Sequence, residues 1–411
     1  MMSSLPRTGT QHLLDLLAPY APDDFIDGHW PNGFTGGRRC ALSAAQLWRV
    51  HLLALLTPTH SLNLLVAQLP EQAAWRRFAR LRRHLPGARM LHEFRERVGV
   101  SGLRQINQQL LTRLLRRQGG QPHAVALMDA TDLPAACVGF KKNTGTYSAR
   151  HAALGGRTIK TGQSRWYVGY KKHTLRLWLP TAHASVTLLP LVSWVTPANV
   201  TEGGLLVPSL RWCERHLGWW PGIVVADMGY LGSQSKQAAR EHWQTAAVTQ
   251  LRSDMKLVSP YTSATQMACP QGQSLVWWEY VPESQTQWFH TPESPTLCRH
   301  CWAAAGCPRH FGYPAAAHET LLGLLPLGSR VAQRLLRQVR PWIEPAQSFE
   351  KNRLGLSQMF FNSLRLTWQM SLLADSAVLL RTMAWLDVPT GAHDLAWLTP
   401  RQMELGLAEE N

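Results

Sequence analysis

Val125-Ala-Leu-Met-Asp129-Ala-Thr-Asp132 is the stretch around which the rest of the chain is organised. A short apolar run that stops on carboxylates is typical of a buried strand that delivers an acid to the edge of a sheet. The run Gly222-Ile-Val-Val-Ala-Asp227 has the same form, and Gly229 permits a tight turn after it. The sequence therefore predicts two buried strands, each ending on an acid.

A third acid, Glu344, lies far downstream among cations. Arg337 and Lys351 stand one heptad before and after it, and Arg340 precedes it by four residues, so a helix would align them. Because Pro341 and Pro345 flank Glu344, we expect a break or kink near 341–345, with a new helical segment that starts there and has a proline in its first turn. Carboxylates from two strand ends and a helix suit Mg²⁺ or Mn²⁺. Two such ions about 4 Å apart can activate water and stabilise the leaving oxygen in phosphodiester cleavage. The candidate catalytic residues and metal ligands are Asp129, Asp227 and Glu344.

These residues resemble a known family. Arg340-x3-Glu344-x6-Lys351 is similar to the signature of the DDE transposases of bacterial insertion sequences, the broad group named for insertion sequences four and five. Arg337 stands where that signature has a tyrosine. Asp129-Ala-Thr131 and Asp227-Met-Gly-Tyr230 are similar to the two aspartate motifs, and the resemblance covers roughly residues 40 to 385.

The resemblance implies a ribonuclease-H-like fold in which the first two acids lie on the adjacent first and fourth strands. It also implies a cut-and-paste transposase in which Arg340 and Lys351 clamp phosphates. The partners would be double-stranded DNA, as terminal inverted repeats and as target, bound by a homodimer in the cytoplasm at the nucleoid. A nuclease of the same fold without strand transfer remains an alternative, as does a DNA-binding regulator with an inactive catalytic fold.

The pattern of the middle of the chain independently predicts a mixed α/β sheet with flanking helices. Strands are expected at 125–128, 166–178, 184–192, 222–226 and 246–251, with helices from 201 and over 232–242. Residues 1–120 are expected to form an all-helical domain, in which Leu42-Ser43-Ala-Ala-Gln46 is a capping-box helix start.

Charge favours a nucleic-acid partner. Against 26 acids stand 42 Lys and Arg, which gives a net charge of +16. We expect neither a membrane span nor a signal peptide, because no apolar run reaches about 20 residues and the N-terminus lacks an apolar core. Residues 1–120 hold 16 Arg and 7 acids, or 16 − 7 = +9. The predicted phosphate contacts in this region are Arg76, Arg77, Arg80, Arg82 and Arg83.

Two further segments have alternative interpretations. Residues 90–98 form either the recognition helix of a helix-turn-helix unit, as the family implies, or a solvated surface helix. Residues 141–176 carry nine Lys and Arg and no acid, so this segment either binds phosphates, with Lys171 and Lys172 among the contacts, or is a basic loop that orders on DNA.

Between Asp227 and Glu344 the chain is longer than the fold requires, which predicts an insertion at 253–321. Four of its cysteines are candidates for a closed structural zinc site, since thiolates select Zn²⁺. His300 or His310 could replace one ligand, and four reduced cysteines without metal are the alternative. An aromatic β pair is expected at 276–281 and 287–290. The candidate zinc ligands are Cys269, Cys298, Cys301 and Cys307.

The predicted organisation follows from these segments. It comprises a helical DNA-binding domain at 1–120, a catalytic domain in two parts at 121–252 and 322–385, the inserted zinc-ribbon-like subdomain at 253–321, and a tail at 386–411. Cys40, Cys137 and Cys213 have no clustered partner in sequence and are expected to be small core residues.

Overall fold

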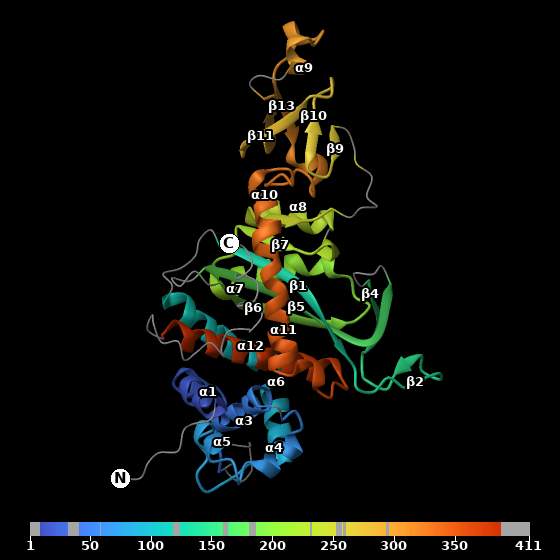
Figure 1. The fold of residues 1–411 in the computed structure, drawn as a ribbon. Helices are drawn as coiled ribbons and strands as arrows, with labels where there is room; N and C mark the ends of the chain where they lie inside the picture. Colours follow the sequence, from blue (N-terminus) through green and yellow to red (C-terminus); the bar gives the residue numbers. More distant parts are fainter. Residues whose placement is uncertain are drawn as a thin grey trace.

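The computed structural model describes most of the chain, from the helical N-terminal region to the last long helix (Figure 1). Cys40 and the tail beyond 387 lie outside the described residues. The described residues are 9–31, 41–57, 59–117, 124–158, 163–180, 186–230, 232–251, 257, 260–292 and 296–387.

The N-terminal region is helical, as predicted. At the start of α3, Ser43 Oγ accepts a hydrogen bond from Gln46 N at 3.2 Å and Ser43 N donates to Gln46 Oε1 at 2.8 Å, which confirms the capping box. The helices are α1 (Gly9–Leu17), α2 (Asp23–His29), α3 (Ala44–Leu56), α4 (Leu62–Gln68), α5 (Ala73–Phe78) and α6 (Ala88–Arg117).

Helix α6 is two helices joined at Gly99, whose φ of 64° and ψ of −170° interrupt the helical backbone. The first part contains the predicted recognition segment 90–98. The second part packs against α12 (Leu364–Leu386), where Asn107 Nδ2 donates to Leu372 O at 2.9 Å. The guanidinium of Arg104 lies over the Trp194 and Trp368 rings at 4.3 and 4.7 Å. The helical region and the sheet therefore share one core across residue 120.

The central sheet is mixed, which confirms the predicted α/β class. Its order is β4-β5-β1-β7-β8, with β6 also paired to β5. Strand β1 is antiparallel to β5 and parallel to β7, which is in turn parallel to β8. The strands are β1 (Val125–Pro134), β4 (Ala153–Thr158), β5 (Ser164–Pro180), β6 (Val186–Pro197), β7 (Ile223–Ala226) and β8 (Ala246–Thr249).

A helix precedes each of the parallel strands β7 and β8, near the positions expected. Helix α7 (Leu206–Leu217) precedes β7 and α8 (Ser233–Trp243) precedes β8. A short hairpin, β2 (Phe140–Lys141) and β3 (Thr146–Tyr147), leaves the body beyond the end of β1 (Figure 1).

A helical rod from Arg330 to Arg353 crosses the sheet (Figure 1). It consists of α10 (Arg330–Arg334), a π turn, a 3₁₀ turn at Arg340–Trp342, α11 (Ile343–Ser348) and a second π turn. Pro341 and Pro345 cannot donate backbone hydrogen bonds, so the regular α pattern stops and restarts there. This confirms the expected start of a new segment, with Glu344 in the first turn of α11.

Apolar packing holds this rod against one face of the sheet. Leu127, Val225 and Val248 from the strands form one buried cluster with Leu336 and Val339 of the rod. Asp129 and Asp227 follow Leu127 and Val225 by two residues, so their side chains leave the sheet on this same face.

The insertion forms a separate sheet with the order β13-β12-β11-β10-β9. The predicted aromatic pair is confirmed, because β11 and β12 are antiparallel with Trp277 opposite Phe289. Arg240 of α8 ties the insertion to the main body through an ion pair with Glu319 at 2.6 Å. The strands are β9 (Tyr261–Ser263), β10 (Gln266–Ala268), β11 (Ser274–Val281), β12 (Thr286–His290) and β13 (His310–Pro314), with helix α9 (Thr296–Arg299) between the last two.

Among the residues described, none of the helices has the length and apolar character that a membrane span requires.

Candidate active site and cysteine cluster

Asp129 and Asp227 meet at the carboxyl ends of two neighbouring parallel strands. The pairing of β1 with β7 ends at Met128 and Ala226, and each acid is the next residue. The sequence predicted a strand that ends on Asp129. Strand β1 instead continues beside β5 as far as Pro134, so Asp129 lies within a long strand. Because the parallel partner stops there, Asp129 still lies beside the end of β7.

The environment of Asp129 disfavours its charged form. The pKa of its carboxyl is raised to about 7, chiefly by burial and to a lesser extent by the nearby charges of Asp227 and Glu202. The hydrogen bond from Ala130 N at 2.7 Å and the charge of Arg340 act in the opposite direction. A cation bound beside the end of β7 would relieve the repulsion among these carboxylates.

Arg340 joins the rod to the second acid. Its Nη2 donates to Asp227 Oδ1 at 2.7 Å, and both side chains are partly exposed. The predicted cation thus lies within the acid site. Arg337, one turn earlier, is exposed on the rod.

Glu344 lies on the helix that docks beside Asp129, with its side chain exposed. One turn later, Gln347 Nε2 donates to Ala130 O at 3.1 Å and holds α11 on β1. Lys351, half-buried, follows in the next turn. The structure therefore brings the helix of the third acid to the site, while the acids whose charges act on Asp129 are Asp227 and Glu202.

Glu202 was not predicted as a site residue. It lies after β6, receives a hydrogen bond from Lys171 Nζ at 3.0 Å, and its carboxylate occupies the space that a Cβ on Gly229 would take. The pKa of Tyr230 is raised well above its usual value by burial and then by Glu202, Asp129 and Asp227. All three acids therefore surround the turn that follows β7. One sequence signal could have identified Glu202, because it is the first acid after Asp132.

The predicted phosphate contact at Lys172 is wrong. Its buried ammonium lies 2.6 Å from Glu350 and 2.7 Å from Asp375, and Arg176 also pairs with Glu350 at 2.6 Å. Burial alone would raise the pKa of Glu350, but Arg176 and Lys172 lower it below its usual value. Glu350 is therefore engaged inside the protein and is not an alternative to Glu344. Lys171, paired with Glu202, is likewise largely buried.

The arginines predicted to form one phosphate-binding cluster in the helical region separate into two groups. Arg76 donates to the carbonyls of Leu69 and Pro70, and Arg77 and Arg80 form ion pairs with Asp15 and Asp23 at 3.3 and 2.7 Å. These contacts engage the guanidinium groups within the domain, while the side chains of Arg77 and Arg80 stay 58% and 63% exposed. Arg82 and Arg83 are also exposed and, among the residues that the structure describes, form no ion pair with a carboxylate.

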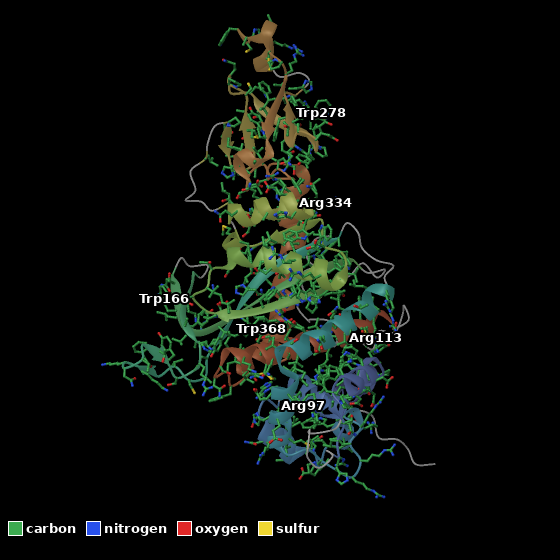
Figure 2. All side chains as sticks on the ribbon, turned by 180° about the vertical axis from the view of Figure 1, so that it is seen from behind. Arg97, Arg113, Trp166, Trp278, Arg334 and Trp368 are labelled. Carbon is green, nitrogen blue, oxygen red and sulfur yellow. The ribbon has the colours of Figure 1, made fainter. Side chains whose placement is uncertain are left out.

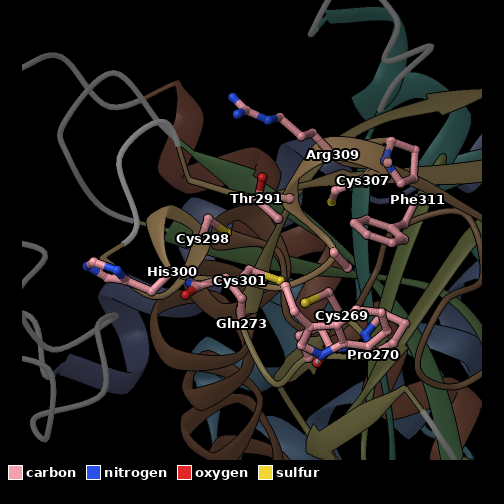
Figure 3. A pocket seen from close by; sticks show the side chains of 16 residues that line it. Cys269, Pro270, Gln273, Thr291, Cys298, His300, Cys301, Cys307, Arg309 and Phe311 are labelled. Carbon is pink, nitrogen blue, oxygen red and sulfur yellow. Dashed lines mark hydrogen bonds between the residues drawn. The ribbon is translucent and has the colours of Figure 1, made fainter.

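The four predicted zinc ligands line one cavity of about 550 Å³ at the far end of the insertion (Figure 3). Cys269 follows β10, Cys298 lies in α9, and Cys301 and Cys307 follow it; all four are free thiols. The pKa of Cys298 is raised by desolvation and then by the other three cysteines, so the thiols are close enough to interact. His300 lines the same cavity, whereas His310 stacks on Trp278 at 4.8 Å.

The two remaining described cysteines lie apart from this cavity. Cys213 is buried on α7, as expected, and Cys137 is half-buried. Within the described ranges, no three Cys, His, Asp or Glu side chains are arranged so that they could hold a metal ion in the present conformation. The sequence matches no known family model and no curated protein.

Proposed function

We propose that this protein is a DDE-type DNA transposase with a ribonuclease-H-like catalytic domain. One observation supports the proposal above the others: Asp129 and Asp227 follow paired residues of adjacent parallel strands, and the rod bearing Arg340, Glu344 and Lys351 lies over them. Further support comes from the pairing of β1 with β7, which are the first and the fourth of the five strands expected from the sequence, as the resemblance implies.

The donor set fits hard divalent cations in its chemistry, because it offers carboxylate oxygens where the pairing of β1 with β7 ends. When bound, two Mg²⁺ or Mn²⁺ ions would supply an activated water and charge stabilisation at the leaving oxygen. Asp129, Asp227 and Glu344 would hold them. Arg340 would move from Asp227 to the scissile phosphate, since a guanidinium binds phosphate in the same bidentate way as carboxylate. Lys351 would bind a neighbouring phosphate from the same helix.

The DNA would be the ends of the mobile element, and then the target, joined by attack of the freed 3′ hydroxyl. We propose that a homodimer acts on terminal inverted repeats in the cytoplasm, associated with the nucleoid. The insertion would hold one Zn²⁺ through Cys269, Cys298, Cys301 and Cys307, because four soft thiolates suit this ion and leave no open position for catalysis.

The test uses supercoiled plasmid incubated with the full chain in Mg²⁺, in Mn²⁺ and in chelator. We expect nicked and linear DNA only with a divalent cation, and joined products when a second DNA with free 3′ ends is added. Cleavage without joined products would identify a nuclease of the same fold. DNA binding without any cleavage would identify a regulator and overturn the enzymatic proposal.

A further inference from the structure

The hairpin β2–β3 and the segments that carry it form an arm, which we define as residues 136–150. Both of its ends are bonded to one segment of the body: Ala136 N donates to Phe361 O at 2.8 Å, and Arg150 N donates to Asn362 O at 2.9 Å. Between them, Ser148 N donates to Gly139 O at 2.7 Å. The base of the arm is therefore held by backbone hydrogen bonds, while its tip extends away from the body (Figure 1).

The tip carries positive charge with no compensation. The arm itself contains Lys141, Lys142 and Arg150 and not one Asp or Glu. Lys141 and Lys142 lie at the turn with exposed side chains, and neither has a carboxylate partner in the described part of the chain. Gly145, at φ 63°, closes the turn in a conformation that favours glycine. A polyanion would neutralise these charges and is therefore the kind of partner that the tip would bind best.

The arm also exposes aromatic surface. Phe140 is 56% exposed and stacks edge-on with Tyr147 across the two strands, with ring centroids 5.3 Å apart. Trp166 of β5, a strand of the central sheet, is 64% exposed on the same side of the molecule (Figure 2). The exposed ring of Phe140, with Lys141 and Lys142 beside it, therefore offers apolar surface next to positive charge, which a partner can cover.

We propose that the arm enters the major groove of duplex DNA, with Lys141 and Lys142 on the phosphates and Phe140 against base edges. A two-stranded ribbon fits the width of this groove, and phenylalanine makes apolar contacts with thymine methyl groups. A second copy of this chain is a poorer partner, since two such arms would repel each other. The arm leaves β1 beyond Asp129 on the acid-bearing strand, so DNA at the acids would extend toward it. The proposal rests on the proposed function, because it supplies a contact for the same DNA.

The test measures binding of the full chain to a short DNA duplex of mixed sequence, by fluorescence anisotropy over a series of salt concentrations in chelator. Lys141→Ala with Lys142→Ala should lower the slope of log affinity against log salt by about 0.9 for each phosphate that the variant no longer neutralises. Phe140→Ala should weaken binding roughly fivefold or more with no change of slope, because it removes an uncharged contact.

Arg211→Ala with Arg215→Ala is the matched control, since it removes two exposed cations from α7, away from the arm (Figure 1). A photo-cross-linker at Asn143 should label DNA, whereas the same group at Arg211 should not. Equal slopes for the arm and control variants would overturn the arm proposal, as would a change in oligomeric mass caused by the arm variants alone. If the unaltered chain binds no duplex and makes no metal-dependent cut, the proposed function fails instead.

Discussion

Arg340 on the rod donates a hydrogen bond to Asp227 at the end of β7, at 2.7 Å, across 113 positions of sequence. This contact joins a residue of the downstream signature to the second acid of the upstream pair. Gln347, which donates to Ala130 O at 3.1 Å, makes the corresponding link to β1 beside the first acid. Two hydrogen bonds thus align the rod with both acid-bearing strands.

The first prediction concerns the three candidate catalytic acids. Asp129→Asn, Asp227→Asn and Glu344→Gln should each abolish cleavage and leave DNA binding largely intact, because each removes a metal ligand but no phosphate contact. Plasmid cleavage and anisotropy binding measure the two effects. The control is Asp132→Asn, which should be much milder, since Asp132 accepts a hydrogen bond from Tyr167 at 2.8 Å and faces away from Asp129. Full activity in any of the three variants would remove that residue from the site.

The second prediction distinguishes Glu350 from Glu344. Glu350→Gln should lower the free energy of unfolding by about 3–5 kcal/mol, because it leaves Lys172 and Arg176 buried without their shared carboxylate. Urea unfolding followed by circular dichroism provides the measurement. Glu344→Gln should leave the unfolding midpoint almost unchanged, since this side chain is exposed. Loss of cleavage in a stably folded Glu350→Gln, with Glu344→Gln active, would show that the third acid had been misassigned.

The third prediction concerns pH. The pKa of Asp129 is raised to about 7 in the folded protein, well above its unfolded value, so folding favours the protonated form. The contribution of Asp129 to the free energy of unfolding is fully present below pH of about 4 and is lost as the pH rises through 7. In chelator at pH 8, Asp129→Asn should therefore be more stable than the unaltered chain by about 1–3 kcal/mol, after allowance for partial solvent access. The two proteins should converge at pH of about 4. If the two proteins differed equally in free energy of unfolding at both pH values, the difference would not come from the raised pKa of Asp129.

The fourth prediction separates the arginines of the helical region. Arg82→Ala with Arg83→Ala should weaken binding to any DNA and flatten its salt dependence, by about 0.9 for each phosphate that is no longer bound. Arg80→Ala should chiefly lower the melting temperature, because Arg80 pairs with Asp23, which also binds Arg49. Thermal melts and salt titrations of both variants provide the comparison. If Arg82→Ala with Arg83→Ala left the salt dependence of binding unchanged, the DNA-binding surface would lie outside this segment.

The fifth prediction concerns the cysteine cluster. Freshly purified protein should contain about one zinc per chain, and Cys298→Ser with Cys301→Ser should lose it, because a structural zinc site needs its thiolates. Elemental analysis gives the metal content, and proteolysis should then show local unfolding of the insertion. Cys213→Ser is the control, since this buried residue lies on α7 outside the cavity. Absence of zinc from the unaltered protein would end this assignment.

Local patterns of the sequence were sufficient for the coarse features. The alternation of apolar runs with helical periods predicted the mixed sheet, the helices α7 and α8 and the aromatic pair β11–β12. Ser43 and Gln46 predicted the start of α3, and the prolines predicted the new segment near Glu344. Each of these depends on residues close together in the chain, where spacing alone decides which side chains share a face or a turn.

The tertiary structure decided which charged residues are available. Lys172 looked like a phosphate ligand in a basic segment, but the fold buries it beside Glu350 and Asp375, which lie 178 and 203 residues away. Glu202 gave no recognisable motif, yet it reaches the turn after Asp227. The sequence by itself determined where acids and bases stand along strands and helices. Only the folded chain determined which of them neutralise one another, because the burial and the partner of a charge come from segments that are distant in sequence.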